Sequence, residues 1–291
     1  MRDPFLCGPD ARLERTLRAG RPTMLRISRE QLQVFEQLSR QSFVNETIDH
    51  LRQFTPVHAR SLQPDGLRSI IELGVQRAHR HGFTQRGPVR LYIEVMFILG
   101  SDFDSDPQFP WAAAVLDKER ADESQLDRAR ELHRATNSYL DVVAGPSGKH
   151  ALEALLRAQS GGLNPAFNSL VDVDRQHLEI LQILGPEKSS YVGERGLREL
   201  IRHGRSMARA HDALTVTDEA LIVLLMFGLG HGCLTDPQFP WIATILSEFE
   251  AGGDKFVRLR STAMYFLGKT VKRLSRSSGP QPEPARSGAR P

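Results

Sequence analysis

The chain has 291 residues, of which 40% are hydrophobic and 25% charged, the proportions of a globular protein with one or two domains. Only two cysteines are present, so a disulfide framework is excluded and a reducing compartment is expected. No apolar run approaches the roughly 18 residues that cross a bilayer. Residues 1–23 also lack the apolar core of a secretory signal. We therefore expect a cytoplasmic protein.

The net charge of +3 is concentrated at the two ends of the chain. Residues 1–23 hold five Arg against three acidic residues, and residues 275–291 hold three Arg against one Glu. Each end therefore carries +2, which leaves −1 for residues 24–274. A nearly neutral folded part does not favour a nucleic-acid-binding groove.

The first predicted helix begins after Ser28, which forms a capping box with Gln31 and has Ile27 and Leu32 at the staple positions. Pro56 ends this helix. Between the two ends, apolar residues recur at helical spacing. They are Leu32, Phe35, Leu38, Val44, Ile48 and Leu51.

A second helix, capped by Gly82, carries one apolar stripe. The stripe consists of Leu67, Ile70, Ile71, Val75 and Ala78. Gly74 lies within this helix, and Gly204 takes the matching position in a later one. Because glycine inside a helix costs about 1 kcal/mol relative to alanine, its presence at both positions predicts a close approach between helices.

A third helix is predicted to start at Gly87-Pro88, with Pro88 at its first position. Its later counterpart starts at Thr217-Asp218, with a threonine cap. Residues 91–99 are apolar nearly all round, which predicts a buried central helix. A short fourth helix is predicted to have Asp106 as its N-cap and Pro107 at its first position, with Pro110 still in the first turn.

A fifth helix is predicted from about residue 123 to residue 143, with a counterpart from 255 to 274. Pairing Thr136 and Tyr139 with Thr262 and Tyr265 requires an offset of 126 residues. No stretch shows convincing strand alternation. The predicted fold class is therefore all-α.

One internal repeat dominates the sequence. The hexapeptide Asp106-Pro-Gln-Phe-Pro-Trp111 recurs 130 residues later as Asp236-Pro-Gln-Phe-Pro-Trp241. The same offset, applied without gaps, aligns residues 51–118 with residues 181–248 and gives 22 identities in 68 positions. We call these stretches the first and second matched segments. Chance does not produce such agreement, so we predict two tandem copies of a roughly five-helix module, each too long to be a solenoid repeat.

The predicted organisation follows from this repeat and from the breakers around it. Gly145-Pro-Ser-Gly148 and residues 160–165 separate the copies. Met24 begins the first copy and is either the true initiator or the end of a loose arm. The predicted parts are an N-terminal arm (1–23), copy one (24–145), a linker with a short helix (146–165), copy two (166–274) and a disordered tail (275–291).

The repeated hexapeptide is the most specific candidate site. Its aromatic residues, Phe109, Trp111, Phe239 and Trp241, are candidates for gripping a protein partner, since Trp and Phe anchor many interfaces. The alternative, which we favour, is a capped helix whose aromatic side chains plug the core.

Metal and catalytic signatures are lacking. Asp102, Asp104 and Asp106 alternate as in half of a calcium loop, but the central Gly and the bidentate Glu are absent. His81 recurs as His211 without a second ligand at metal-binding spacing, so we expect a structural role. No nucleotide, hydrolase or protease motif is found, and no cofactor or metal is expected.

A basic stripe lies on one predicted helix face. It consists of Arg198, Arg202, Arg205 and Arg209, near i, i+4 and i+7 spacing. We favour a solvated face, with an acidic partner or nucleic acid as the alternative.

Several strings of the first copy resemble a set of small uncharacterised bacterial proteins. The strings are Met24-Leu-Arg-Ile-Ser28, Gly82-Phe-Thr-Gln-Arg-Gly-Pro88, Tyr92-Ile-Glu-Val-Met-Phe97 and Phe103-Asp-Ser-Asp-Pro-Gln-Phe-Pro-Trp111. That family is associated with gene clusters of type VI secretion spike proteins and effectors. The resemblance extends to the second copy only through the hexapeptide, and the string from Gly82 to Gly87 is absent there, so Phe83 and Arg86 are partner-binding candidates confined to copy one.

We therefore expect a non-enzymatic protein that binds another protein, as an adaptor, chaperone or immunity partner. The resemblance implies that this partner is a secreted effector or a spike component. The alternatives are an enzyme or toxin with a site between the modules, and a nucleic-acid-binding protein. The copies diverge at residues 84–87 and 101–105, which are the segments where function is expected.

Overall fold

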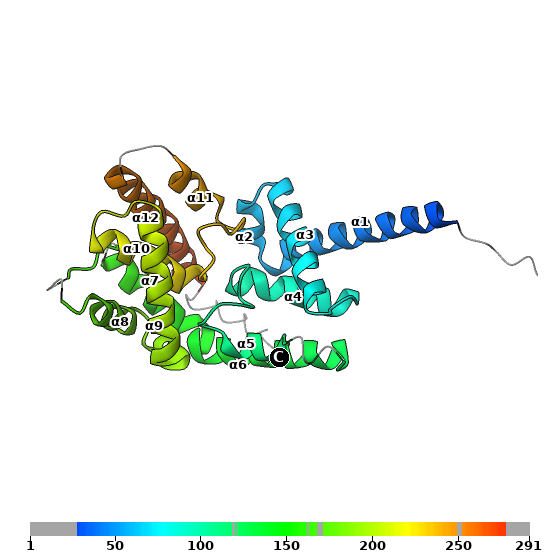
Figure 1. The fold of residues 1–291 in the computed structure, drawn as a ribbon, viewed down its shortest axis with the longest axis horizontal. Coiled ribbons are helices and arrows are strands. Elements are labelled where there is room, and N and C mark those ends of the chain that lie inside the picture. Colours follow the sequence, from blue (N-terminus) through cyan, green and yellow to red (C-terminus); the bar gives the residue numbers. More distant parts are fainter. Residues whose placement is uncertain are drawn as a thin grey trace, which may run out of the picture. The chain divides into compact units, whose positions relative to one another are not determined.

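The computed structural model describes residues 28–117, 120, 122–161, 163–167, 171–248 and 252–277 (Figure 1). Every regular element in these ranges is helical, which confirms the all-α prediction. The elements are α1 (Arg29–Phe54), α2 (Pro56–Ser61), α3 (Pro64–Arg80), α4 (Arg86–Leu99), α5 (Pro110–Val115), α6 (Gln125–Val143), the short 3₁₀ turn η2 (Pro146–Gly148), α7 (Lys149–Ser160), α8 (Val173–Leu184), α9 (Pro186–Ala210), α10 (Val216–Leu229), α11 (Pro240–Ser247) and α12 (Gly252–Ser277).

The chain divides into two compact units, residues 1–43 and 44–291. In the first unit the structure describes the opening turns of α1. The predicted capping box is confirmed there: the Ser28 amide donates to Gln31 Oε1 at 2.9 Å, and the Gln31 amide donates to Ser28 Oγ at 3.2 Å. The predicted arm (1–23), Met24 and the staple residue Ile27 lie outside the described residues.

In the second unit, two apolar helices form the centres of packing. α4 packs against α3 and α6, and α10 packs against α8, α9 and α12. From Asp218 to Phe227 every residue of α10 is buried, and α4 buries Val89, Tyr92 and Ile93 among others. The prediction of buried central helices is confirmed.

The glycines at the middle of α3 and α9 lie against these central helices. A Cβ on Gly74 would come within 2.6 Å of Ile93 Cγ1, and one on Gly204 within 2.8 Å of Val223 Cγ2. The predicted close approach is confirmed. Both glycines contact the residue that follows them by 19 positions in the sequence.

The starts of three predicted helices are wrong. α5 begins at Pro110, after Phe109 as N-cap, and Asp106 does not cap it because its carboxylate bonds backbone amides elsewhere. α10 is capped by Thr215 through a capping box with Asp218, whereas Thr217 lies inside the helix. α4 begins at Arg86, which places Pro88 in the first turn but not at its first position.

The burial patterns of the two last long helices, α6 and α12, agree better at an offset other than the predicted one. Buried positions recur 127 residues apart, as in Arg128 and Lys255 (1% and 4% exposed) and Leu132 and Leu259 (both 0%). Tyr265, the predicted partner of Tyr139, is 57% exposed. Burial thus favours an offset of 127 over the predicted 126 for these two helices. α12 also continues to Ser277, and residues 278–291 of the predicted tail lie outside the described residues.

Substituting Gly74 or Gly204 by alanine should destabilise the fold by about 1–3 kcal/mol, since the added methyl overpacks the contact with α4 or α10. The measurement is the free energy of unfolding from denaturant titration. Gly66→Ala on α3 is the matched control, because a Cβ there meets nothing within 4 Å. Equal effects at Gly66 and Gly74 would contradict the packing explanation.

Candidate functional site

Two features of the second unit could carry function: a buried polar cluster between the matched segments, and a groove between α4 and α6. The cluster, which we call the polar junction, consists of Ser101, Asp106, Gln108, His231, Asp236 and Gln238.

The polar junction is a reciprocal exchange of hydrogen bonds. Asp236 accepts from the Ser101 amide at 2.8 Å and from Ser101 Oγ at 2.7 Å. Asp106 in turn accepts from the amide of His231, the residue 130 positions after Ser101, at 2.7 Å. Each aspartate also accepts from the amide of the glutamine two residues later, at 2.8 and 2.9 Å. Each repeated motif therefore holds the loop of the other matched segment.

The two glutamines bond the ends of the central helices. Gln108 Nε2 donates to the Met226 carbonyl at 3.1 Å, and Gln238 Nε2 donates to the Met96 carbonyl at 2.8 Å. The same two carbonyls also accept from the amides of Gly100 and Gly230 at 2.9 and 3.0 Å. Each glutamine thus adds a second hydrogen bond to a carbonyl in the last turn of a helix of the other matched segment.

Two glycines allow the helix ends to meet. Gly100 and Gly230 have φ of +100° and +99°, which favours glycine. A Cβ on Gly100 would come within 2.7 Å of the Leu229 carbonyl oxygen, and one on Gly230 within 2.9 Å of the Leu99 carbonyl oxygen. Any side chain at either position would force the two segments apart.

The electrostatics of the junction rest on Asp106 and His231. Burial alone would raise the pKa of Asp106, but its contacts with His231 and with backbone amides outweigh burial and lower it. Burial alone would lower the pKa of His231, but Asp106, whose Oδ2 lies 3.3 Å from Nδ1, outweighs burial and raises it. The two groups form an ion pair when His231 is protonated.

His58 and Lys188, also 130 positions apart, flank the junction. His58 Nε2 lies 3.0 Å from Gln238 Oε1, and its ring lies edge-on to Phe97. Lys188 donates to the Phe227 carbonyl with its ammonium 4.7 Å from the centroid of the Phe227 ring. Burial lowers the pKa of Lys188 to about 8. His58 thus contacts a glutamine of the junction, whereas Lys188 contacts the C-terminal end of α10.

A second polar network occurs only in the first matched segment. His81 Nε2 lies 2.8 Å from Asp104 Oδ2, and the Tyr92 hydroxyl donates to the same oxygen at 2.7 Å. His81 Nδ1 lies 2.9 Å from the Leu116 carbonyl. Both ring nitrogens of His81 are therefore engaged within the protein. This arrangement ties His81 and Tyr92 to the loop after α4.

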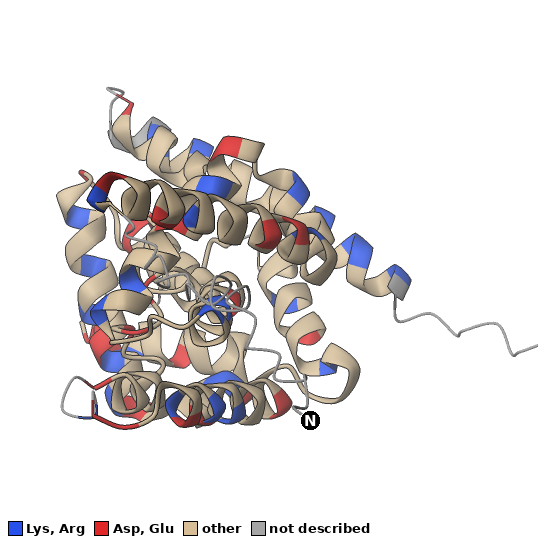
Figure 2. Ribbon diagram, turned by 90° about the vertical axis from the view of Figure 1, so that its right-hand side faces the viewer, with Lys and Arg blue, Asp and Glu red and all other residues tan. Residues whose placement is uncertain are grey.

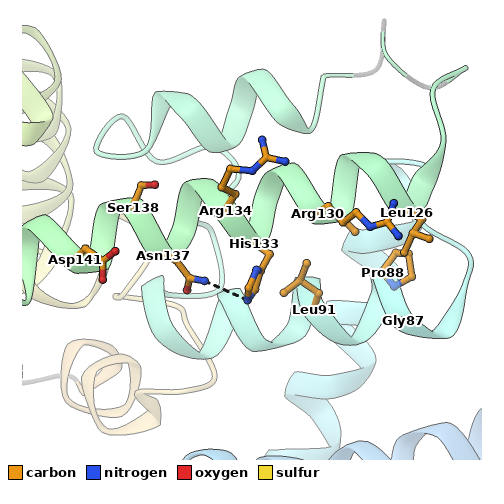
Figure 3. Close-up of a pocket in the computed structure, with 11 residues that line it drawn as sticks. Gly87, Pro88, Leu91, Leu126, Arg130, His133, Arg134, Asn137, Ser138 and Asp141 are labelled. Carbon is orange, nitrogen blue, oxygen red and sulfur yellow. Dashed lines mark hydrogen bonds between the residues drawn. The ribbon is translucent and has the colours of Figure 1, made fainter.

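A groove of about 690 Å³ lies between α4 and α6 (Figure 3). Its buried lining includes Pro88 and Ala129, and Leu126 at its edge is 46% exposed. Leu91 points from α4 toward α6, and His133 points from α6 toward α4 (Figure 3). The α6 side adds the polar residues Arg130, His133, Arg134, Asn137, Ser138 and Asp141.

Sequence reasoning missed this groove. Its α6 residues follow a helical stripe, but the stripe is mostly polar and gives no hydrophobic periodicity. The opposite wall comes from α4, which a single sequence does not place next to α6. Only Gly87, at one end of the groove, falls in a string that was expected to be functional.

The aromatic candidates of the hexapeptides are mainly packing residues. Phe109 is 2% exposed, and its ring meets the Tyr139 ring edge-on at 5.2 Å between centroids. The ring centroids of Trp111 and Tyr139 lie 6.1 Å apart, and those of Trp241 and Phe266 lie 5.3 Å apart. Phe239 is partly buried against the core of the second matched segment. These contacts agree with the favoured interpretation that the aromatic side chains plug the core.

The two candidates from the glycine-rich string differ in exposure. Phe83 is 0% exposed, with the Arg128 guanidinium 5.2 Å from its ring centroid, and is therefore a core residue. Arg86 is exposed at the start of α4, where it donates to Glu46 Oε2 at 2.7 Å.

The basic stripe on α9 is largely paired with acidic residues. Arg209 Nε donates to Glu219 Oε1 at 2.6 Å, and Arg205 bonds both Glu219 and Asp174. Arg198 pairs with Glu194, and Arg202 is exposed. Figure 2 shows basic and acidic residues interspersed along the helices. This pairing weakens the case for nucleic-acid binding.

Within the described ranges, no group of three or more His, Cys, Asp or Glu side chains could hold a metal ion, and the three aspartates after α4 bond protein groups. No helix of the described residues is long and apolar enough to cross a membrane. Comparisons with family models, curated proteins and solved structures found no match to this chain.

Removing the Asp236 carboxylate should destabilise the protein by about 2–5 kcal/mol, because Asp236→Ala leaves the buried amides of Ser101 and Gln238 without an acceptor. The measurement is the free energy of unfolding. Thr235→Ala, at the exposed neighbouring position, should change it by no more than about 0.5 kcal/mol. A similarly small loss for Asp236→Ala would show that the junction does not hold the segments together.

The His231–Asp106 pair should make stability depend on pH. The folded-state pKa of His231 is raised. Its contribution to stability is therefore complete below the unfolded-state pKa near 6.5 and is lost as pH rises through the folded-state pKa. The pKa of Asp106 is lowered in the folded state. Its contribution to stability is therefore lost as pH falls from the unfolded-state pKa near 3.8 through the folded-state pKa. His231→Asn should therefore destabilise more at pH 5.5 than at pH 8.5.

The control is the same substitution in an Asp106→Asn background, where most of the difference between the two pH values should disappear. Unfolding free energies of the four proteins form a double-mutant cycle at each pH. A pH-independent coupling between positions 106 and 231 would refute the ion pair.

Proposed function

We propose that the chain is two tandem copies of a roughly five-helix module and acts as a non-enzymatic, cytoplasmic protein-binding protein. The matched segments support the duplication, and so does the recurrence of contacts at fixed offset. α9, for example, contains a non-helical residue, Gly193 (φ +74°), 130 positions after Gln63, the N-cap of α3. The hydrogen bonds of the polar junction recur at the same offset.

One helix, α7, has no partner in this correspondence, and it covers part of α12. The Leu163 carbonyl accepts from Arg260 Nε at 3.3 Å, and a Cβ on Gly268 would lie 3.5 Å from Gln159 Nε2. At the offset of 127, Arg260 and Gly268 correspond to His133 and Asp141 on α6. Both of these residues line the α4–α6 groove.

The single observation that carries the proposal is this difference between the two faces. On α12, Arg260 and Gly268 contact Leu163 and Gln159, although Val257 and Tyr265 of the same helix stay exposed. On the corresponding α6 face, the structure describes an open groove with an exposed leucine at its edge. A groove with both apolar and polar lining residues can dock an amphipathic helix of another protein. We infer that the groove is where a partner binds.

This function agrees with an adaptor, chaperone or immunity partner of a bacterial secreted effector, the setting that the family resemblance implies. The pairing of the α9 arginines favours it over nucleic-acid binding. The network of His81, Asp104 and Tyr92 is the most enzyme-like arrangement among the described side chains. Because both His81 nitrogens are bonded within the protein, this network does not favour the enzyme alternative.

A photo-crosslinking amino acid at Asn137, in the groove, should form an adduct with one defined protein in the native cells, identified by mass spectrometry. The control position is Gln76, an exposed residue of α3. Leu126→Glu should abolish the adduct, whereas Leu214→Glu, at a 72% exposed position outside the groove, should leave it unchanged. Adducts of equal yield from both positions, or none from Asn137, would contradict the proposal.

A further inference from the structure

We propose that the first half of α1 pairs antiparallel with the same segment of a second copy of this chain. The segment comprises residues 28–42, and we call it the exposed segment (the blue end of α1 in Figure 1). This inference goes beyond the proposed function, because it concerns a surface other than the α4–α6 groove and does not depend on what that groove binds.

The exposed segment is a helix whose side chains stay in contact with solvent. Every residue from 28 to 42 is exposed, over about four turns. A helix of this length is marginal in water unless it packs through an apolar face. The capping box at Ser28 stabilises only its first turn. A contact from outside the described part of the chain would therefore stabilise the exposed segment.

A stripe of large apolar side chains runs along the exposed segment. Leu32, Phe35 and Leu38 follow one another at intervals of three residues, which places them on one face of the helix. They are 51%, 59% and 57% exposed. Val44, which is buried, follows Phe35 by about two and a half turns and lies on the opposite face of α1. The stripe is therefore separate from the face through which α1 packs.

The spacing of the stripe favours a second copy of this chain as the partner. A two-fold axis makes one surface meet itself, so that residue i of one chain contacts residue j of the other and the reverse. Phe35 is the middle residue of the stripe and also of the exposed segment. An antiparallel pair centred on Phe35 therefore places Leu32 of each copy level with Leu38 of the other. The overlap ends where α1 becomes buried, at Phe43.

The charge of the exposed segment also favours a second copy. The segment holds two arginines, Arg29 and Arg40, and two glutamates, Glu30 and Glu36, and its other polar residues are glutamine and serine. A segment with no net charge does not repel its own copy. It also lacks the excess of lysine and arginine by which amphipathic helices bind anionic membranes.

The first test measures the sedimentation of the full chain over a range of micromolar concentrations, where we expect a monomer–dimer equilibrium. Phe35→Glu should weaken the dimer at least about tenfold, because the two-fold axis brings both glutamates together. Gln33→Glu is the matched control, since it adds the same charge two residues away, on a different face of the helix. It should change the dissociation constant of the dimer by less than about threefold. Circular dichroism confirms that both variants keep their helix content.

The second test determines the direction of the pair by disulfide crosslinking. Gln31→Cys and Ser39→Cys are made in a Cys7→Ser background, and Cys233 is left in place because it is buried. Positions 31 and 39 lie level in an antiparallel pair centred on Phe35. The two variants should therefore crosslink when they are mixed, and neither should crosslink alone. Crosslinking of each variant with itself would indicate a parallel pair and overturn the proposed direction.

Two further outcomes would overturn the inference itself. One is a chain that remains a monomer throughout the concentration range, and the other is a dimer that Phe35→Glu does not weaken. If a monomeric chain captures a different protein through a photo-crosslinking residue at position 38, or sediments with phosphatidylserine vesicles, that partner covers the stripe instead. The Asn137 adduct reports on the groove alone, so either proposal can fail without the other.

Discussion

The end-to-end meeting of α4 and α10 is the constraint on which the second unit depends. Two helix C-termini bring unpaired carbonyls and partial negative charge to one place, and two buried aspartates add full negative charge. Such a cluster is stable only if donors and cations reach it. The donors are the side-chain amides of Gln108 and Gln238 and the backbone amides of Ser101 and His231, while His231 and Lys188 supply positive charge.

The two sides of the junction reach the same result with different residues. Ser101 satisfies Asp236 with its amide and its hydroxyl, whereas His231 satisfies Asp106 with its amide and an imidazole nearby. His58 contacts Gln238, and Lys188 contacts a helix carbonyl directly. The motif residues are the same on both sides, and on each side they bond the same kind of backbone groups. Their neighbours are free to differ wherever another donor reaches the same acceptor.

Local patterns predicted the helices well, because apolar periodicity and capping residues act within one or two turns. The stripe of α3, the buried α10 and the capping box at Ser28 were all predicted from such patterns. The role of Asp106 was not, since an aspartate before a proline looks like a helix cap. Its actual partners include an amide 125 residues away. Long-range partners of a polar side chain leave no trace in local spacing.

Local spacing also does not show which helices lie side by side. The groove was therefore not predicted, although the neighbouring string 84–87 was. The divergent string 84–87 was expected to carry function, and the structure places its last residue, Gly87, at the end of the groove. Thr84 is bonded to Gln125, at the start of α6, which ties this string to the second wall. The residues that the two matched segments share hold these segments together at the polar junction. α6, which forms one wall of the groove, lies outside the matched segments.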